Sequence, residues 1–399
     1  VVMGRKTWES LPNALKDRTN IILSNKSELP NLPLTGLYLP KEKVNSIPSY
    51  DNSFLLCNEC GHGQLKNVID MEILYDETYT HRSSTSPIST AGNDFFLKFL
   101  NEICGTKKFK NILEVGCNDL YLINKIQDRA KFITGIDPIW KDNDFQHNEK
   151  TKILGKFIHE LEPISDFKEK PDLIISAHTF EHVNETYEQF KMMHELASEE
   201  CIFIIEVPCL DTMMNINRYD QIFHQHLQYL SLSSMIYLIN KLNCTYINHT
   251  FNFSYWGGTI LFAFKKGSSE VKSKSQFDLI KEVKIKEEIK RFRENMINIT
   301  SKLKSLEENV YGFGAAQMLP ILAYHMETDL SFFKGIIDDN PERIGKYLPS
   351  LNSPIISVDN VAEFNNSCVF ICALDSSRKI LKRLIDLTPR KIINPISLF

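Results

Sequence analysis

Short apolar runs alternate with polar, helix-compatible stretches between residues 111 and 266, and this alternation limits the fold more than any other feature. The runs read NILEVGC, KFITGID, DLIISAHTF, CIFIIEVP, TYINHTF and TILFAFKK. Continuous hydrophobic runs of this length are typical of parallel strands that helices cover on both faces. We therefore predict an α/β fold with a doubly wound sheet, whose last two strands form an antiparallel pair.

A second alternation follows towards the C-terminus. VYGFGAAQ, FFKGIIDDNPERIG and SCVFICALD have the order of strand, glycine turn and helix that begins another Rossmann-like unit. Between the two units the chain is rich in Lys and Glu, and it predicts one amphipathic helix of roughly 30 Å that packs on a neighbouring domain. The apolar stripe of this helix recurs at intervals of four and three: Ile285, Ile289, Phe292, Met296, Ile299, Leu303 and Leu306.

Length and composition exclude several classes of protein. A chain of 399 residues predicts two or three domains, and its formal net charge of -4 gives no broad basic field for nucleic acid. No run reaches the roughly 18 apolar residues of a membrane span, and the first residues lack the features of a signal peptide. The nine cysteines lie mostly in strand-like segments, which predicts reduced thiols. We expect a cytoplasmic monomer with no nucleic-acid or membrane partner.

Two strand ends have the polar residues of a nucleoside pocket. ILEVGCNDL places Glu114 at the end of a strand and Gly116 in the following turn, where a Cβ would block close approach of a ligand. About twenty residues on, GIDPIW ends the next strand with Asp137, placed to accept hydrogen bonds from two ribose hydroxyls. Asn118 and Leu120 stand where a dinucleotide motif has glycines, so a ligand without phosphates is favoured.

A third strand end, DLIISAHTFEHVNE, brings His178, Glu181 and His182 to the same carboxyl edge of the sheet. The three motifs together resemble the class I S-adenosylmethionine-dependent methyltransferases. The resemblance implies a Rossmann-like methyltransferase domain over residues 91–268 with S-adenosylmethionine as the cofactor. The residues that would bind this methyl donor are Glu114, Gly116, Asn118, Asp137, Pro138 and His178.

The segment EVPCLDTMMNINRYDQIFHQHLQYLS follows the fifth strand and is unusually rich in ionisable and amide groups. His224 and His226 flank Gln225, and an imidazole pKa of about 6.5 suits a general base near neutrality. The alternative is that one histidine lies on a helix surface while the other is hydrogen-bonded in the core. A metal pair ranks lower, because no third ligand accompanies it.

A family resemblance covers nearly everything after residue 32. The stretches PLTGLYLP, CNECGHGQL, ETYTHRSSTS, ILEVGCND, DQIFHQHLQYLS, SYWGGT, YGFGAAQ and DDNPERIGKYLPSLNSPIIS occur in this order. They resemble the C-methyltransferases that build branched deoxysugars on nucleotide carriers. The resemblance implies that His226 removes the proton beside a keto group of a nucleotide-linked sugar. The resulting enediolate would then attack the donor methyl group.

This chain departs from the family at three positions, where Phe223, Gln225 and His81 replace tyrosine, glutamate and tyrosine. O- or N-methylation of a sugar, or a binding protein without turnover, therefore stays an alternative. The resemblance also implies a partial zinc-knuckle region over residues 32–90, a connecting helix over 269–309 and a second Rossmann-like domain over 310–399 that helps to hold the nucleotide. Catalytic roles fall to His226, Gln225 and His81, and substrate contacts to Phe223, Gly257, Gly258, Gly312 and Gly314. For Gly312, Gly314 and the strand-end acid Asp338, a structural turn with a surface acid is the alternative.

Cys57 and Cys60 look like half of a zinc knuckle, with His62 close behind. Structural zinc takes four ligands, commonly two such cysteine pairs. The family has its other pair near the N-terminus, where residues 1–30 of this chain contain neither cysteine nor histidine. We expect zinc to be absent or weakly bound.

The opening, VVMGRKTWESLP followed by RTNIILS, resembles dihydrofolate reductase over residues 1–31. By position, Gly4, Arg5, Lys6 and Thr7 would begin the helix that touches the phosphate of that enzyme's cofactor. The substrate acid and the later glycines of that enzyme are missing, and a single β-α-β piece cannot form its site. We therefore interpret the opening as a functionally silent remnant of a fused or misjoined reading frame. Because residue 1 is Val and not Met, we expect the chain to be a fragment. A dihydrofolate reductase fragment is the alternative.

Overall fold

The computed structural model describes residues 2–4, 21–23, 29–74, 87–141, 143–163, 165–254, 256–267, 282–361 and 363–396. The chain divides into two compact units. Unit 1 consists of Val1–Tyr79, Met214–His226 and Leu279–Phe399, and unit 2 consists of Thr80–Met213 and Leu227–Asp278. The chain therefore passes between the units after residues 79, 213, 226 and 278.

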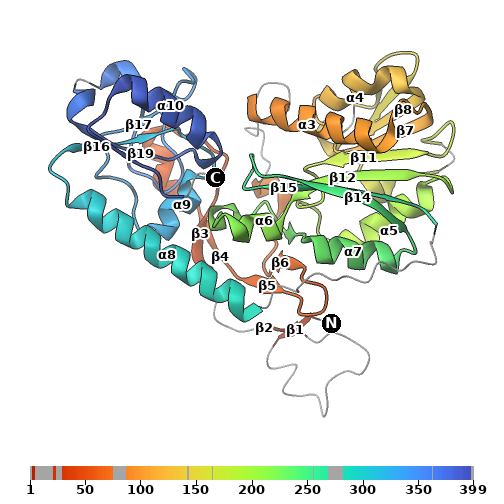
Figure 1. Ribbon diagram of the computed structural model, residues 1–399, viewed down its shortest axis with the longest axis horizontal. Coiled ribbons are helices and arrows are strands. Elements are labelled where there is room, and N and C mark those ends of the chain that lie inside the picture. Colours follow the sequence, from red (N-terminus) through yellow and green to blue (C-terminus); the bar gives the residue numbers. More distant parts are fainter. Residues whose placement is uncertain are drawn as a thin grey trace, which may run out of the picture. The chain divides into compact units, whose positions relative to one another are not determined.

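Unit 2 is built on an eight-stranded sheet of order β14-β15-β12-β11-β7-β8-β10-β9 (Figure 1). Strands β10, β8, β7, β11 and β12 are parallel, and β14 and β15 form an antiparallel pair. This confirms the predicted doubly wound sheet and its last two strands. The strands are β7 (Phe109–Val115), β8 (Ala130–Ile136), β9 (Phe145–Gln146), β10 (Thr151–Leu154), β11 (Leu173–Ala177), β12 (Ile202–Pro208), β14 (Thr245–Asn252) and β15 (Thr259–Lys265).

Helices cover both faces of this sheet. The helices α3 and α4 lie on one face and α5 and α7 on the other (Figure 1). Ile112 of β7 packs in one apolar cluster with Phe96, while the next residue, Leu113, packs in the opposite cluster with Phe190. Burial on both faces is the reason why these strands read as continuous apolar runs. The remaining elements of unit 2 are α3 (Pro87–Cys104), α4 (Tyr121–Ile126), η2 (Gln127–Arg129), η3 (Pro138–Trp140), η4 (Ile158–Glu160), α5 (Thr186–Leu196), β13 (Gln228–Tyr229) and α7 (Leu232–Lys241), and α6 (Leu210–Asn215) crosses into unit 1.

Unit 1 contains a five-stranded, all-parallel sheet of order β18-β17-β16-β19-β20. Its core includes Phe313, Val369 and Leu384, all buried. This confirms the predicted second Rossmann-like fold. The elements are β16 (Asn309–Phe313), α9 (Leu319–His325), β17 (Ile336–Ile337), β18 (Ile355–Ile356), η6 (Val358–Asn360), η7 (Phe364–Asn366), β19 (Ser367–Ile371), η8 (Leu374–Ser376), α10 (Ser377–Leu387) and β20 (Lys391–Ile393).

The N-terminal part of unit 1 consists of short pieces. Strands β3 and β4 pair antiparallel, β5 and β6 form a hairpin, and β1 and β2 pair parallel. Leu39 and Tyr347 exchange two backbone hydrogen bonds of 2.8 Å, which fasten this region to the C-terminal sheet domain. The pieces are β1 (Val2–Gly4), β2 (Ile21–Leu23), β3 (Leu29–Pro33), η1 (Lys41–Ser46), β4 (Ser49–Asn52), β5 (Phe54–Leu56), β6 (Gly63–Leu65) and α2 (Met71–Leu74).

The amphipathic helix is α8 (Glu282–Lys304), which ends earlier than the predicted range of 269–309, and residues 269–281 of that range lie outside the described residues. Ile285, Phe292, Met296 and Leu303 of its predicted stripe are buried. The Phe292 ring lies 5.2 Å from that of His325 in α9, so the helix packs on its own unit. Among the described residues, no helix combines the length and the apolar character needed to cross a bilayer.

The segment Met214–His226 belongs to unit 1, although the sequence placed it inside the methyltransferase domain. The buried Arg218 guanidinium contacts the carboxylates of Asp220 and Asp375 at 2.8 and 2.6 Å. Tyr219 packs its ring 5.6 Å from that of Phe292 in α8. The segment thus finds its charge partner and its apolar partner in the C-terminal half of the chain, which no local sequence pattern reveals.

The buried His325 of α9 allows a test of the packing in unit 1. Burial, together with the charge of Arg293, lowers the pKa of His325 to about 3. As the pH falls, His325 therefore binds a proton in the unfolded chain before it does so in the folded protein. The free energy of unfolding should fall as the pH drops from about 6.5 towards 3, by at most about 1.4 kcal/mol per pH unit. Urea unfolding at several pH values should show a smaller slope for His325→Leu. The exposed His159→Gln is the control, and an unchanged slope in His325→Leu would contradict the assignment.

Candidate functional site

The loop after β7 is tied to the end of β8 by backbone hydrogen bonds. Gly116 and Asn118 both have left-handed backbones, with φ of +79° and +41°. The N–H groups of Gly116 and Cys117 donate to Ile136 O at 2.8 and 3.1 Å, and the Asn118 N–H donates to Asp137 Oδ2 at 2.9 Å. The sheet order reverses beside β7, and ligands bind at such points in doubly wound sheets. The structure thus brings the predicted loop residues and the predicted acid together.

Asp137 holds two turns at once. Besides the hydrogen bond from Asn118, its carboxylate accepts one from the Ile139 N–H at 3.0 Å. Asp137 thereby caps the short helix η3, which begins at Pro138. Trp140 Nε1 donates to Asn118 O at 2.9 Å and closes the arrangement. Each carboxylate oxygen can accept two hydrogen bonds, so a ribose hydroxyl would share an oxygen with a backbone N–H.

Close approach of a ligand, the predicted reason for a glycine at position 116, is only part of the explanation. A Cβ at this position would lie 2.0 Å from Thr179 Oγ1, so the glycine is needed where the chain packs on itself as well as for the approach of a ligand. Three predicted substrate-binding glycines have similar packing roles: a Cβ would meet Thr212 Oγ1 at 2.5 Å from Gly258, Cys372 Sγ at 2.7 Å from Gly312 and Ala373 Cβ at 2.4 Å from Gly314. Gly257 has a left-handed backbone with φ of +71°.

Glu114 is a buried acid beside this loop. Its Oε2 has no hydrogen-bond partner, and only 3% of the residue is exposed. Burial, together with the charges of Asp137 and Asp119, raises the pKa of Glu114 to about 8. A cation bound nearby would favour the ionised form of Glu114, whereas a phosphate would favour the protonated form.

His178 follows β11 in a left-handed conformation, with φ of +54°. Its Nδ1 lies 3.1 Å from Glu181 Oε1, its Nε2 lies 3.8 Å from Glu206 Oε1, and its ring centroid lies 4.1 Å from that of Trp256. Burial alone would lower the pKa of His178, but the two carboxylates raise it to about 10. The imidazole therefore carries a positive charge at neutral pH and cannot accept a proton there.

Two members of this cluster were missed in the sequence. Glu206 lies within the apolar run of β12 and accepts a hydrogen bond from Thr259 Oγ1 at 2.7 Å. An acid in a buried strand costs stability unless it is paired. An acid within an apolar run therefore could have indicated a functional side chain in the sequence. Trp256 lies against α3, where a Cβ on Gly92 would meet its ring at 2.3 Å.

Of the two histidines flanking Gln225, one is the hydrogen-bonded core residue that the sequence offered as an alternative, and neither lies on a helix surface. His224 is a core residue: its Nε2 lies 3.0 Å from Leu32 O and its Nδ1 lies 3.1 Å from Asn52 Nδ2. Both nitrogens are engaged, Nε2–H as a donor and Nδ1 as an acceptor, so His224 is unsuited to be a base. Gln225 Oε1 accepts a hydrogen bond from Thr35 Oγ1 at 2.7 Å.

His226 is 8% exposed, and its ring centroid lies 4.1 Å from that of Phe223. The His226 N–H donates to Phe223 O at 3.0 Å, which forms a tight turn. His226, Gln225 and Phe223 all belong to unit 1, whereas the predicted donor-binding residues belong to unit 2. His81 lies outside the described residues.

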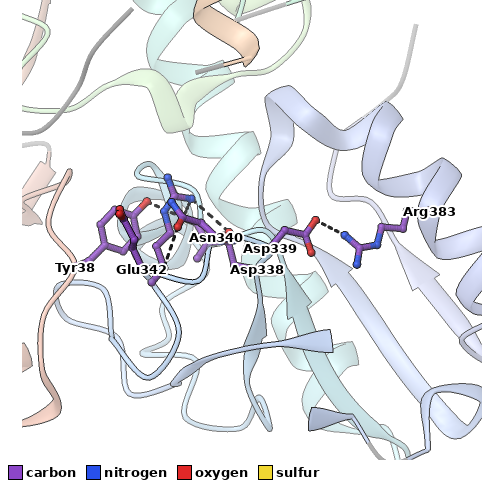
Figure 2. Close-up of polar contacts among 8 residues, drawn as sticks. Tyr38, Asp338, Asp339, Asn340, Glu342 and Arg383 are labelled. Atoms are coloured by element: carbon purple, nitrogen blue, oxygen red, sulfur yellow. Dashed lines mark hydrogen bonds and ion pairs between the residues drawn. The ribbon is translucent and has the colours of Figure 1, made fainter. Parts of the chain in front are cut away.

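In the C-terminal sheet, an acid after one strand holds two turns in the same way as Asp137 does after β8. Asp338 follows β17 and accepts hydrogen bonds from the Ala315 N–H at 2.7 Å and the Asn340 N–H at 2.9 Å (Figure 2). Here the chain itself adds further partners. Tyr38 donates to Ala315 O at 2.9 Å, and the Arg343 guanidinium lies 4.6 Å from the centre of the Tyr38 ring and 3.4 Å from Asp338 Oδ2. The neighbouring Asp339 pairs with Arg383 of α10 (Figure 2).

Cys57 and Cys60 lie in the turn between β5 and β6, both half-buried. The Cys57 N–H donates to His62 O at 2.8 Å, and the Gly61 N–H donates to Cys57 O at 2.9 Å. Among the described residues, no third cysteine, histidine or carboxylate joins the pair as a metal ligand.

Three family models match the chain. Residues 91–249 match a methyltransferase domain, so the class of the central domain is the one that the sequence predicted. Residues 275–392 match the C-methyltransferase C-terminal domain, and residues 1–43 match dihydrofolate reductase. The two larger matches confirm the predicted resemblance to C-methyltransferases, and the third confirms the resemblance of the opening.

The C-methyltransferase NovU of Streptomyces niveus is 22% identical over 212 residues, which make up 52% of this chain and 50% of that protein. The chain thus matches about half the length of this curated relative. Among solved structures, the N-methyltransferase NodS of Bradyrhizobium japonicum WM9 with S-adenosyl-L-homocysteine has a TM-score of 0.35 and 13% identity, covering 45% of this chain and 88% of that one. The 1,6-didemethyltoxoflavin-N1-methyltransferase of Burkholderia thailandensis has a TM-score of 0.36 and 12% identity, covering 45% and 79%.

The contact between Gly116 and Thr179 can be tested by Gly116→Ala. The clash and the left-handed backbone should together destabilise the protein by roughly 2 to 4 kcal/mol. Gly105→Ala is a matched control, since its φ is +52° but no atom lies within 4 Å of the new Cβ. The control should lose only about 1 kcal/mol through backbone strain. Equal midpoints of urea unfolding for the two variants would show that packing on Thr179 is not the reason for this glycine.

Proposed function

We propose that the chain is an S-adenosylmethionine-dependent methyltransferase that methylates a carbon atom of a nucleotide-linked keto-deoxysugar. The observation that carries the proposal is the clamp of Asn118 and Asp137 beside the buried Glu114, at the reversal point of a sheet that matches a methyltransferase domain. The match of residues 275–392 and the name of the curated relative support carbon as the methylated atom.

The residues of the pocket suit this donor chemically. When bound, S-adenosylmethionine supplies a methyl group on a positively charged sulfonium. Glu114 is a buried acid with an unpartnered oxygen, and a cation nearby would stabilise its ionised form. Asp137 is positioned by Asn118 and Ile139, and a carboxylate at this place is the group that accepts hydrogen bonds from ribose hydroxyls. The left-handed turn at Gly116 brings the backbone to the edge where a ligand would lie.

His226 is the base in this proposal. Its imidazole would take the proton from the carbon beside the keto group, and the electron pair of the broken C–H bond would form the enediolate, with its charge on the former carbonyl oxygen. The neighbouring histidines are poorly suited to this role, because the ring nitrogens of His224 are both engaged and His178 is already protonated near neutral pH. A positioned base contributes roughly 10² to 10⁴ in rate.

Donor binding should release a proton through Glu114. Its pKa of about 8 means that the carboxyl is mostly protonated at pH 7, and a bound cation favours the ionised form. Calorimetry with S-adenosylmethionine at pH 7 in buffers of different ionisation enthalpy should detect release of a fraction of one proton. Glu114→Gln should abolish the dependence on buffer, while Glu199→Gln, whose side chain is 84% exposed, should keep it. A heat that is independent of buffer in the parent protein would contradict the role of Glu114.

The role of His226 is tested by transfer of a labelled methyl group to nucleotide-linked 4-keto-deoxysugars. His226→Ala should lower the rate by roughly 10²- to 10⁴-fold. It should bind the donor as tightly as the parent, because the predicted donor residues belong to the other unit. NMR of the product should show a new C–CH₃ group, and a methyl group on oxygen or nitrogen would exclude C-methylation. A His226→Ala variant as fast as the parent would exclude His226 as the base.

A further inference from the structure

Two buried polar atoms at the carboxyl edge of the sheet in unit 2 have no hydrogen-bond partner among the described residues. They are Glu206 Oε2 near the end of β12 and Asn252 Nδ2 at the end of β14, and the two residues are 1% and 4% exposed. One atom is an acceptor and the other is a donor. Because buried polar groups are normally paired, two of opposite kind at one sheet edge indicate a place where a ligand supplies the partners.

The register of the sheet places both side chains on one face. Glu206 pairs with Leu261 of β15, and Asn252 pairs with Thr259, two residues away in the same strand. Residues that pair directly and residues two apart in a strand point to the same face. This is the face that α3 covers, because Leu261 packs in the apolar cluster of Phe96. Thr259 Oγ1 donates to Glu206 Oε1 at 2.7 Å, so only the other carboxylate oxygen lacks a donor.

An indole ring and an imidazole border the same region. The hairpin turn between β14 and β15 contains Trp256, whose ring packs against α3. The Trp256 ring centroid lies 4.1 Å from that of His178, and His178 Nε2 lies 3.8 Å from Glu206 Oε1. Sites for small ligands commonly combine an aromatic wall with a few placed polar groups. The described side chains here have this composition.

The order of the strands indicates which part of a ligand would lie here. The proposed donor site uses the ends of β8 and β7, and the sheet continues from β7 through β11, β12 and β15 to β14. Neighbouring strands are about 4.8 Å apart, so along this edge Glu206 lies roughly 10 Å and Asn252 roughly 19 Å from β7. A ligand bound there lies beside the donor on the same edge, as a methyl acceptor must. A hydroxyl group both donates and accepts, so it suits a carboxylate oxygen and an amide N–H together.

We propose that Glu206 and Asn252 bind hydroxyl groups of a sugar ring and form an acceptor subsite within unit 2. The hydroxyls donate to Glu206 Oε2 and accept from Asn252 Nδ2, and the indole of Trp256 lies alongside the ring. The role as an acceptor subsite rests on the proposed function, whereas binding of a sugar ring can be measured without methyl transfer. Because both side chains are buried, a ligand reaches them only if neighbouring chain shifts, and the turn at residues 256–258 joins the two strands beside them.

Two substitutions of nearly equal size reverse the two groups. Glu206→Gln keeps an oxygen for Thr259 and replaces the other oxygen by an amide donor. Asn252→Asp keeps the oxygen that accepts from the Ser254 N–H at 3.0 Å and replaces the donor by an acceptor. Each single variant should weaken sugar binding at least about tenfold, because a hydrogen bond becomes a repulsive contact. The double variant has one donor and one acceptor again, in exchanged places, and a hydroxyl that turns should recover most of the affinity.

The measurement is saturation-transfer NMR of the full-length protein with L-rhamnose, L-fucose and 6-deoxy-D-glucose, with and without S-adenosyl-L-homocysteine. Titration of each sugar gives its dissociation constant. Two matched controls should bind the sugars like the parent: Glu199→Gln, whose side chain is 84% exposed, and Asn248→Asp, earlier in β14, whose amide contacts Glu102 at 3.2 Å. Circular dichroism shows which variants are folded, and Asn252→Leu replaces Asn252→Asp if the added charge unfolds the protein.

A trapped water molecule is the competing occupant, because it also donates and accepts. No saturation transfer to any of the three sugars, from a parent protein that is folded, would favour water and overturn the proposal. Sugar binding that neither single variant weakens, or that the controls weaken equally, would overturn it as well. A double variant that binds no better than the single variants would exclude a hydroxyl as the bound group. Sugar binding without any methyl transfer would instead contradict the proposed function and leave this site standing.

Discussion

In both sheet domains, a carboxylate at the end of one parallel strand accepts a hydrogen bond from the loop that follows the neighbouring strand. The arrangement of both loops depends on this interaction. Asp137 accepts from the backbone of Asn118 and Ile139, and Asp338 accepts from the backbone of Ala315 and Asn340. In both cases one oxygen fixes the loop of the neighbouring strand and the other fixes the acid's own turn. The loops can adopt left-handed conformations at defined positions because an ionised group with two acceptor oxygens compensates the backbone N–H groups.

The residues around Asp137 and Asp338 differ in the two units. Around Asp137 the chain places the buried acid Glu114, one of whose oxygens has no hydrogen-bond partner and whose pKa is raised by burial to about 8. Around Asp338 it places Arg343 and Tyr38, so the carboxylate already has a cationic partner and the loop carbonyl already has a donor. The same backbone geometry thus lies beside an unpartnered acid oxygen in unit 2 and beside an arginine and a tyrosine in unit 1.

Much of the fold could be predicted because strands buried on both faces read as apolar runs, and α8 shows its stripe at helical intervals. The loop at Gly116 and the acid Asp137 could be predicted because their spacing follows from one strand, one turn and one helix. Three features could not. The pairing of Arg218 with Asp375 joins residues far apart in sequence, the packing of Gly116 on Thr179 depends on a third strand, and the charge on His178 depends on Glu206 in a fourth. Local periodicity has no information on contacts of this kind.

Unit 1 is assembled from three separate stretches of the chain, and this has a consequence for evolution by recombination. An exchange of genetic material between residues 227 and 278 would bring a foreign C-terminal domain to a resident Met214–His226 segment. Arg218 would then meet a residue not selected with it in place of Asp375, and Tyr219 would meet an unfamiliar helix in place of Phe292. In relatives of this chain, the segment Met214–His226 and the segment Leu279–Phe399 should therefore be inherited together and should co-vary.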